Sequence, residues 1–253
     1  MNRKKLMLQK SIFIVIVIYV FAGCEQKNEI SSKSEPYTKP SYTDISEDTT
    51  QVSLHFTDIT QSAGIDFKHE TGAFGKKWMP ETIGSGVGLF DYNNDGLVDI
   101  FLVNSSFWKG HKKSNVLPTQ KLYQNLGNNK FDDLTAEVGL DISLYGMGCA
   151  IADYDSDGDL DLYITAVGDN KLLRNDTNTF TDVTKKFGVT GSNTEAGTPP
   201  AWSTGAAWVD VDNDGWLDLF VCNYVIWTPE TDLYMTLDGT TKSYATPQQY
   251  QGE

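Results

Sequence analysis

The chain has 253 residues, of which 40% are apolar and 12% aromatic, so it can fill the core of one large domain or two small ones. It carries 34 Asp and Glu against 20 Lys and Arg, which gives a formal net charge of −14 at pH 7. Such an acidic surface repels phosphate backbones, so we expect no nucleic acid partner, and it attracts cations instead.

The amino terminus predicts an exported protein. The first ten residues carry four positive charges, and an apolar run follows over residues 12–22. This run is too short to span a bilayer, which takes roughly 20 residues, but it suits the apolar part of a signal peptide. It ends in Phe-Ala-Gly-Cys24, which resembles the lipobox of bacterial lipoproteins except that Phe21 stands where Leu is usual. We therefore predict a lipoprotein signal peptide over 1–23, with an ordinary signal peptide cleaved nearby as the alternative.

The same signals predict a location and a linker. Lipidation of Cys24 would attach the mature chain to a bacterial membrane, in the periplasm or at the cell surface. The stretch 24–52 is rich in Ser, Thr, Glu and Lys, and such a composition cannot bury enough apolar surface to fold alone. We predict a flexible tether with a reach of about 30 Å, followed by a folded domain over 53–253.

From residue 53 the sequence is a series of related repeats. Short apolar runs alternate with Gly, Asn and Asp, with a period of about 60 residues. The first half of the repeat, an aspartate-rich loop between two apolar runs, occupies 88–103, 150–165 and 207–222. The second half, which begins Lys-Leu and continues to Phe-x-Asp, occupies 121–140 and 171–189, with a truncated copy over 56–65. About four short strands per period predict all-β propeller blades, whereas β-solenoid repeats are usually much shorter.

Inserts of variable length interrupt the repeats at about 104–119, at 190–204 and from 224 onward. They carry aromatic residues, among them Trp108, Trp202 and Trp227. Exposed aromatic residues in loops suit contact with a partner, so a protein or glycan ligand could bind at the inserts. Small satellite cores beneath long loops explain the same residues equally well, and the sequence leaves both readings open.

Two cysteines remain after Cys24. Cys149 and Cys222 lie in apolar, strand-like runs of different repeats. We expect both to be small buried hydrophobic residues rather than a disulfide pair.

The three aspartate-rich loops share the spacing of oxygen-bearing side chains. Positions 1, 3, 5 and 9 are Asp91, Asn93, Asp95 and Asp99; Asp153, Asp155, Asp157 and Asp161; and Asp210, Asp212, Asp214 and Asp218. Four such side chains within nine residues repel one another unless a cation lies between them. Gly at position 6 permits a tight turn, and the position 7 carbonyl, from Leu97, Asp159 or Trp216, can add a ligand. This donor set predicts Ca²⁺ at about three sites.

An EF-hand is excluded although the loops open like one. An EF-hand needs Glu at position 12 and flanking helices, and here position 12 is Leu102, Ile164 or Val221 within strand-like runs. An Asx-rich turn without an ion could explain one such loop. Three copies at matching positions favour the metal site.

On these loops the chain resembles the FG-GAP/VCBS repeats of integrin α-subunit propellers. The segments Phe-Thr-Asp-Ile-Thr over 56–60 and Met-Pro-Glu-Thr over 79–82 also resemble the start of cartilage-acidic-protein-like (ASPIC/UnbV-associated) proteins. The resemblance implies a Ca²⁺-binding β-propeller that serves in extracellular adhesion or recognition. Asn93 replaces the usual Asp, so we expect the first site to be the weakest. About three to four blades' worth of sequence cannot close a ring, so we expect a fragment of a longer propeller.

The sequence gives little sign of an enzyme. The Asp clusters recur in the same local setting, whereas a catalytic carboxylate pair normally occurs once, and no nucleophile elbow, P-loop or zinc-protease motif is present. Glu81 could be functional, but a turn leading into the first repeat is the simpler role. We expect an adhesion or recognition module. The alternatives are the scaffold of a larger secreted enzyme, such as a glycan-processing hydrolase, and a purely structural surface protein.

Overall fold

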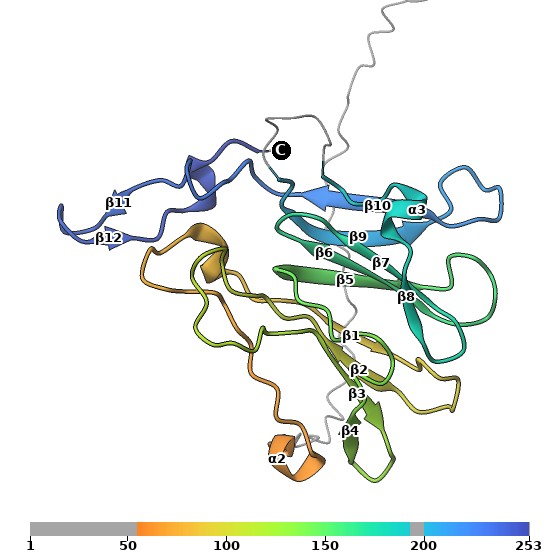
Figure 1. Ribbon diagram of the computed structural model, residues 1–253. Helices are drawn as coiled ribbons and strands as arrows, with labels where there is room; N and C mark the ends of the chain where they lie inside the picture. Colours follow the sequence, from red (N-terminus) through yellow and green to blue (C-terminus); the bar gives the residue numbers. More distant parts are fainter. Residues whose placement is uncertain (1–54, 193–199, 253) are drawn as a thin grey trace, which may run out of the picture. The chain divides into compact units, whose positions relative to one another are not determined.

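The computed structural model describes residues 55–192 and 200–252 (Figure 1). The predicted signal peptide over 1–23, the lipid site at Cys24 and the tether over 24–52 lie outside the described residues. The same holds for residues 193–199 of the second insert and for Glu253.

Two four-stranded antiparallel sheets follow one another along the chain. The first contains β1 (Val87–Phe90), β2 (Asp99–Leu102), β3 (Lys121–Asn125) and β4 (Phe131–Asp133), and the second contains β5 (Gly146–Ala152), β6 (Asp161–Ala166), β7 (Lys171–Asn175) and β8 (Phe180–Asp182). In each sheet the strands pair in sequence order, as a meander. The prediction of about four short strands per repeat is therefore confirmed for these two repeats.

The third repeat has two strands. These are β9 (Ser203–Val209) and β10 (Asp218–Asn223), and a short hairpin of β11 (Met235–Thr236) and β12 (Lys242–Ser243) follows. The helical turns are α2 (Thr60–Ala63), η1 (Met79–Thr82), α3 (Thr184–Phe187) and η2 (Pro247–Gln249). Within the described ranges, no helix has the length and apolar character that crossing a bilayer requires. The described chain is thus nearly all β.

The first strands of the three repeats, β1, β5 and β9, lie side by side (Figure 1). Glycine permits this close approach, because a Cβ on Gly86 would lie 3.0 Å from the Cα of Gly148, and a Cβ on Gly148 would lie 2.9 Å from the Thr204 carbonyl oxygen. The Gly86 N–H also donates to the Met147 carbonyl at 2.8 Å. The arrangement is that of consecutive blades of an incomplete propeller.

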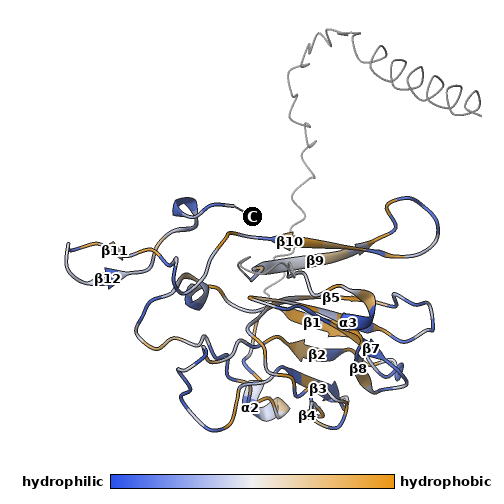
Figure 2. Cartoon of the chain, turned by 45° about the horizontal axis from the view of Figure 1, so that its top comes forward, coloured by the Kyte–Doolittle hydropathy of each residue, from blue (hydrophilic) through white to orange (hydrophobic). Residues whose placement is uncertain are grey.

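Apolar side chains fill the spaces between neighbouring sheets. In Figure 2 the strand β1 is orange, that is hydrophobic, whereas β7 and β8 also carry blue, hydrophilic residues. Because side chains alternate along a strand, the second sheet contributes to two cores, one on each face. Phe101 and Leu122 of the first sheet pack with Leu162 of the second. Tyr163 and its neighbours on the opposite face of the second sheet pack with Trp208 of the third.

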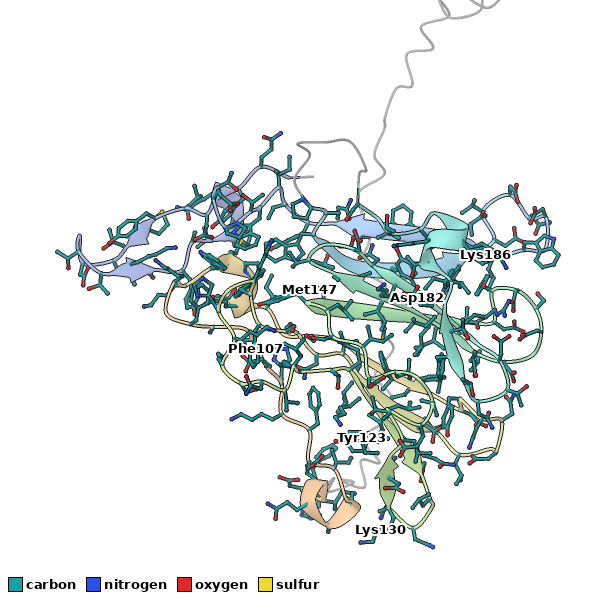
Figure 3. The ribbon with its side chains drawn as sticks, viewed as in Figure 1. Phe107, Tyr123, Lys130, Met147, Asp182 and Lys186 are labelled. Carbon is teal, nitrogen blue, oxygen red and sulfur yellow. The ribbon has the colours of Figure 1, made fainter. Side chains whose placement is uncertain are left out.

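The truncated copy at the start of the domain packs on the first sheet, although residues 56–58 form no strand. Lys130 Nζ donates to the Ser62 carbonyl at 2.5 Å, and the Tyr123 hydroxyl donates to Asp66 at 2.9 Å; Lys130 and Tyr123 are labelled in Figure 3. These bonds fix α2 and the turn after it beside β3 and the β3–β4 turn.

The inserts and the segment around η1 build a third cluster, which we call the insert core. It contains Met79, Tyr145, Met147, Trp202, Val225 and Trp227, with Trp78 and Trp108 packed against it. Trp202 is 0% exposed and Trp227 is 1% exposed. For these two residues the satellite-core interpretation is therefore correct, and they are not surface contacts for a ligand.

Glu81 is a buried carboxylate beside this core. It is 6% exposed, its Oε2 accepts from the Tyr244 hydroxyl at 3.2 Å, and its Oε1 has no hydrogen-bond partner in the described chain. Burial disfavours the ionised form and so raises the pKa of Glu81 above its ordinary value. Its place in η1, shortly before β1, agrees with the predicted turn.

Replacing Glu81 with glutamine is expected to stabilise the protein at pH 7 by about 1 kcal/mol, because the amide keeps the shape without the charge. Because the folded-state pKa of Glu81 is raised, its destabilising effect is absent below the ordinary glutamate pKa of 4.5, develops as the pH rises from there to the folded-state pKa, and stays constant above it. The gain should therefore grow from acid toward neutral pH in denaturant titrations. The exposed Glu137→Gln is the matched control; equal, pH-independent effects of the two changes would contradict this account.

Candidate metal centres

Each aspartate-rich loop joins the first two strands of its repeat. The carboxylate at position 1 holds the loop in its curled conformation by accepting hydrogen bonds from the backbone. In the second loop Asp153 accepts from the N–H groups of Asp157 and Gly158, both at 3.0 Å. The equivalent bonds measure 3.0 and 2.7 Å in the first loop and 3.1 and 2.9 Å in the third. The three loops are therefore the same structure, as the repeated spacing predicts.

The backbone of each loop turns through two left-handed residues. In the second loop these are Ser156 with φ 59° and Gly158 with φ 98°. The equivalent residues are Asn94 with φ 58° and Gly96 with φ 86°, and Asn213 with φ 61° and Gly215 with φ 92°. Residues with a Cβ tolerate φ near 60°, as position 4 shows, but the φ of 86° to 98° at position 6 lies beyond that region and favours Gly.

Gly158→Ala is expected to cost about 1 kcal/mol of unfolding free energy, because alanine is strained at this φ. No atom would lie within 4 Å of the new Cβ, so the cost is conformational rather than steric. Gly205→Ala in β9 is the matched control, because its Cβ also meets open space but its φ is not left-handed. Denaturant midpoints compare the two variants, and a loss at Gly205 equal to that at Gly158 would refute the argument.

The position 9 carboxylates of the first two loops are buried at the start of β2 and β6. Asp161 is 0% exposed and accepts from the N–H groups of Tyr154 at 3.1 Å and Asn175 at 2.8 Å. Asp99 makes the equivalent bonds at 3.1 and 2.7 Å. Each carboxylate therefore ties its loop to the third strand of its sheet. Burial outweighs these bonds and raises the pKa of Asp161 to about 7.

Positions 1, 3 and 9 converge in the second and third loops. Carboxylate oxygens of Asp153, Asp155 and Asp161 lie within 4.8 Å of one another, as do those of Asp210, Asp212 and Asp218. Asp155 Oδ1 is buried without a hydrogen-bond partner in the described chain. Crowded carboxylate oxygens, one of them buried without a partner, are what a hard cation such as Ca²⁺ needs from a protein. The donor set therefore fits the predicted ion.

The position 5 carboxylates Asp95, Asp157 and Asp214 remain predicted ligands, and each also accepts a backbone hydrogen bond within its own loop. Asp157 accepts from the N–H of Asp159 at 3.0 Å, and Asp214 accepts from that of Trp216 at 2.9 Å, so these carboxylates stabilise the turn. In the first loop Asn93 donates its amide to Asp95 at 3.0 Å. The position 7 carbonyls of Leu97, Asp159 and Trp216 remain predicted ligands.

Residues 91–164 and 153–221 each match the FG-GAP-like repeat, and the two matches together span more than half of the chain. The chain belongs to this FG-GAP-like repeat family. No curated protein sequence matches it. Each FG-GAP-like match begins at a position 1 aspartate, Asp91 or Asp153, and reaches the strand after the following loop. The repeats predicted from the sequence are thus confirmed, while the resemblance to cartilage-acidic-protein-like proteins remains a prediction.

Two details of the FG-GAP-like repeats differ from expectation or were missed. Cys222 was expected to be buried and is exposed on β10, because no described segment covers that strand; Cys149 is half-buried, and both are free thiols. Sequence reasoning also missed Asn125 and Asn175, whose N–H groups anchor the position 9 carboxylates. Their signal was the shared Lys-Leu-x-x-Asn that opens β3 and β7.

Proposed function

We propose that the chain is a calcium-binding FG-GAP-like repeat protein that acts outside the cytoplasm as a recognition or adhesion module. The convergence of Asp153, Asp155 and Asp161 around a partnerless buried oxygen is the observation that carries the proposal. Six to eight oxygen ligands suit Ca²⁺, and backbone carbonyls and water can complete a set of three carboxylates. The recurrence of the cluster in matched repeats favours a structural ion over a catalytic centre.

Calcium is expected to raise the melting temperature of the full chain. At free Ca²⁺ a hundredfold above the dissociation constant the gain is about 2.7 kcal/mol per site, or about 5 to 10 °C for a domain of this size. Melting curves with Ca²⁺, Mg²⁺ and EDTA measure it. Asp155→Asn should reduce the calcium-dependent shift. Asp159→Asn makes the same charge change in the same loop, outside the convergent cluster, and should preserve the shift. An unchanged midpoint would rule out the ion.

The three sites should differ in affinity. The second and third have Asp at all of positions 1, 3, 5 and 9, whereas the first has Asn93 at position 3. Fewer charged ligands weaken a calcium site. Calorimetric titration with calcium compares Asp91→Asn, which impairs the first site, with Asp153→Asn, which impairs the second. The order would be contradicted if Asp91→Asn removed the tightest binding.

The proposal includes export and a lipid anchor. FG-GAP-like repeats are typical of extracellular proteins. The apolar run followed by Phe-Ala-Gly-Cys24 supports a signal peptide and a lipid at Cys24, which would hold the domain at a membrane. The parent chain should incorporate a labelled fatty acid and the Cys24→Ser variant should not. If the variant is labelled as strongly as the parent, this anchor is excluded.

The ligand of the module would bind at the inserts. A cavity of about 440 Å³ lies between the first insert and residues 66–70, and its lining mixes apolar Phe107 and Val116 with charged Lys68 and Glu70. Such mixed surfaces suit a glycan or a protein loop. A glycan array probed with the full chain tests for a glycan ligand, and Phe107→Ala is expected to weaken any binding signal. A signal that this change leaves unaffected would show that the glycan does not bind in this cavity.

A further inference from the structure

A basic patch interrupts the acidic surface at the first insert. Its two segments, residues 74–78 and 107–113, together contain five lysines and one histidine and no Asp or Glu, in a chain whose formal net charge is −14. Four of these lysines, all but Lys113, form no ion pair with any carboxylate of the described chain. Positive charges gathered in this way attract an anionic partner.

Aromatic rings hold the two segments of the basic patch together. The Phe74 ring stacks on the His111 ring with centroids 3.8 Å apart, and the Trp78 ring packs edge-to-face against Trp108 with centroids 5.2 Å apart. Trp108 in turn stacks on Tyr145 of the insert core at 4.2 Å. The lysines therefore extend from two segments that are fixed against each other and against the core, rather than from independent loops.

Two cavities open within the basic patch, and both have Trp108 and Lys109 in their linings. The larger, of about 470 Å³, is also lined by Trp78, His111, Pro229 and Glu230. The smaller, of about 350 Å³, is also lined by Lys112. No residue of the larger cavity lines the cavity of about 440 Å³ described above. Indole faces with polar groups at their rim suit a sugar ring, which has an apolar face and hydroxyl groups at its edge.

The lysines determine the charge of the ligand. An ammonium group donates up to three hydrogen bonds, and those to an ionised oxygen of a carboxylate or sulfate group are the strong ones. A membrane surface fits the patch less well, because binding to a bilayer needs apolar side chains that project into it. Phe74, Trp78 and Trp108 are half-buried instead. Fixed aromatic cavities beside unpaired lysines therefore favour an acidic glycan.

We propose that the basic patch binds an acidic polysaccharide. Its sugar rings lie against Trp78 and Trp108, and its carboxylate or sulfate groups lie at Lys109 and Lys112. Glu230, the carboxylate that lines the larger cavity, accepts hydrogen bonds from sugar hydroxyl groups. The proposal rests on the recognition function proposed above, and it adds the charge of the glycan and the surface that binds it. Because the lysines are exposed, the binding weakens as the salt concentration rises.

Dextran sulfate and neutral dextran test the proposal, because they share one sugar backbone and differ in charge. The full chain should bind dextran sulfate and not dextran at about 0.15 M salt. The double change Lys109→Gln and Lys112→Gln should weaken this binding about tenfold. Lys185→Gln with Lys186→Gln is the matched control and should stay within about twofold of the parent. These two lysines are also exposed, and Lys186 lies at the opposite end of the sheets from Phe107 in Figure 3.

Weaker binding of dextran sulfate by the patch variant, with the control variant unchanged, supports the proposal. It is overturned if the parent chain does not bind, or if the patch variant binds as tightly as the control. Polyglutamate of matched charge has no sugar rings, so equally tight binding to it overturns the glycan class. Preferred binding to phosphatidylglycerol vesicles assigns the patch to a membrane and overturns it too. A calcium-dependent melting shift or a neutral-glycan signal that persists leaves the recognition module standing when this proposal fails.

Discussion

Asp161→Ala is expected to lower the unfolding free energy by about 2 to 3 kcal/mol without calcium, because two buried N–H groups lose their acceptor. These donors belong to Tyr154 and Asn175, so the change loosens both the loop and its link to β7. Removing a buried carboxylate also relieves the unfavourable burial that raises its pKa. That relief offsets part of the lost unfolding free energy. The expected cost is therefore below the sum for two buried N–H groups left without an acceptor.

Two companion variants make this expectation specific. Asp161→Asn removes the charge and keeps one acceptor, but its NH2 group faces the other N–H, so in EDTA it should be only slightly milder than alanine yet equally damaging to calcium binding at that site. Asp218→Ala removes the equivalent carboxylate where it is exposed and accepts from one N–H, so its cost should stay within about 0.5 kcal/mol. Urea unfolding measures all three. Equal losses at Asp161 and Asp218 would show that the third strand does not determine the role of position 9.

The loops could be predicted well because their geometry is local. Alternate oxygen-bearing residues, a glycine at position 6 and apolar flanks specify a curled connection between two strands, whatever surrounds it. Local spacing does not give the distances between the side chains. Carboxylate oxygens of positions 1, 3 and 9 lie within 4.8 Å of one another in the second and third loops, while Asp157 at position 5 accepts from the N–H of Asp159.

The parts that sequence reasoning missed depend on distant segments. The burial of Asp161 requires β7, which begins ten residues later, and the exposure of Cys222 reflects a missing neighbour rather than any property of β10 itself. The insert core is the strongest case. Trp202 and Trp227 come from different inserts and meet Met79, more than a hundred residues away in sequence. An aromatic residue in a loop looks the same in sequence whether it binds a ligand or fills such a core.

Trp227→Ala should therefore be the most destabilising change in the inserts, with an expected cost of about 4 kcal/mol. The side chain is 1% exposed and packs against Trp78, Trp108 and Trp202, with ring centroids between 5.2 and 6.0 Å away. Alanine leaves a cavity among rigid rings that cannot close around it. The change also removes the Nε1–H that donates to Asp232 at 2.7 Å.

Trp216→Ala is the matched control, because Trp216 lies in the third aspartate loop and is 57% exposed. Its loss should stay within about 0.5 kcal/mol. Trp227→Phe keeps most of the volume but not the donor to Asp232, so it should fall between the two. If Trp227→Ala unfolds at the same urea concentration as Trp216→Ala, the insert core contributes little. If the expected order holds, a loss of ligand binding in Trp227→Ala reports a collapsed core, and mapping a binding face must use exposed residues such as Val116 instead.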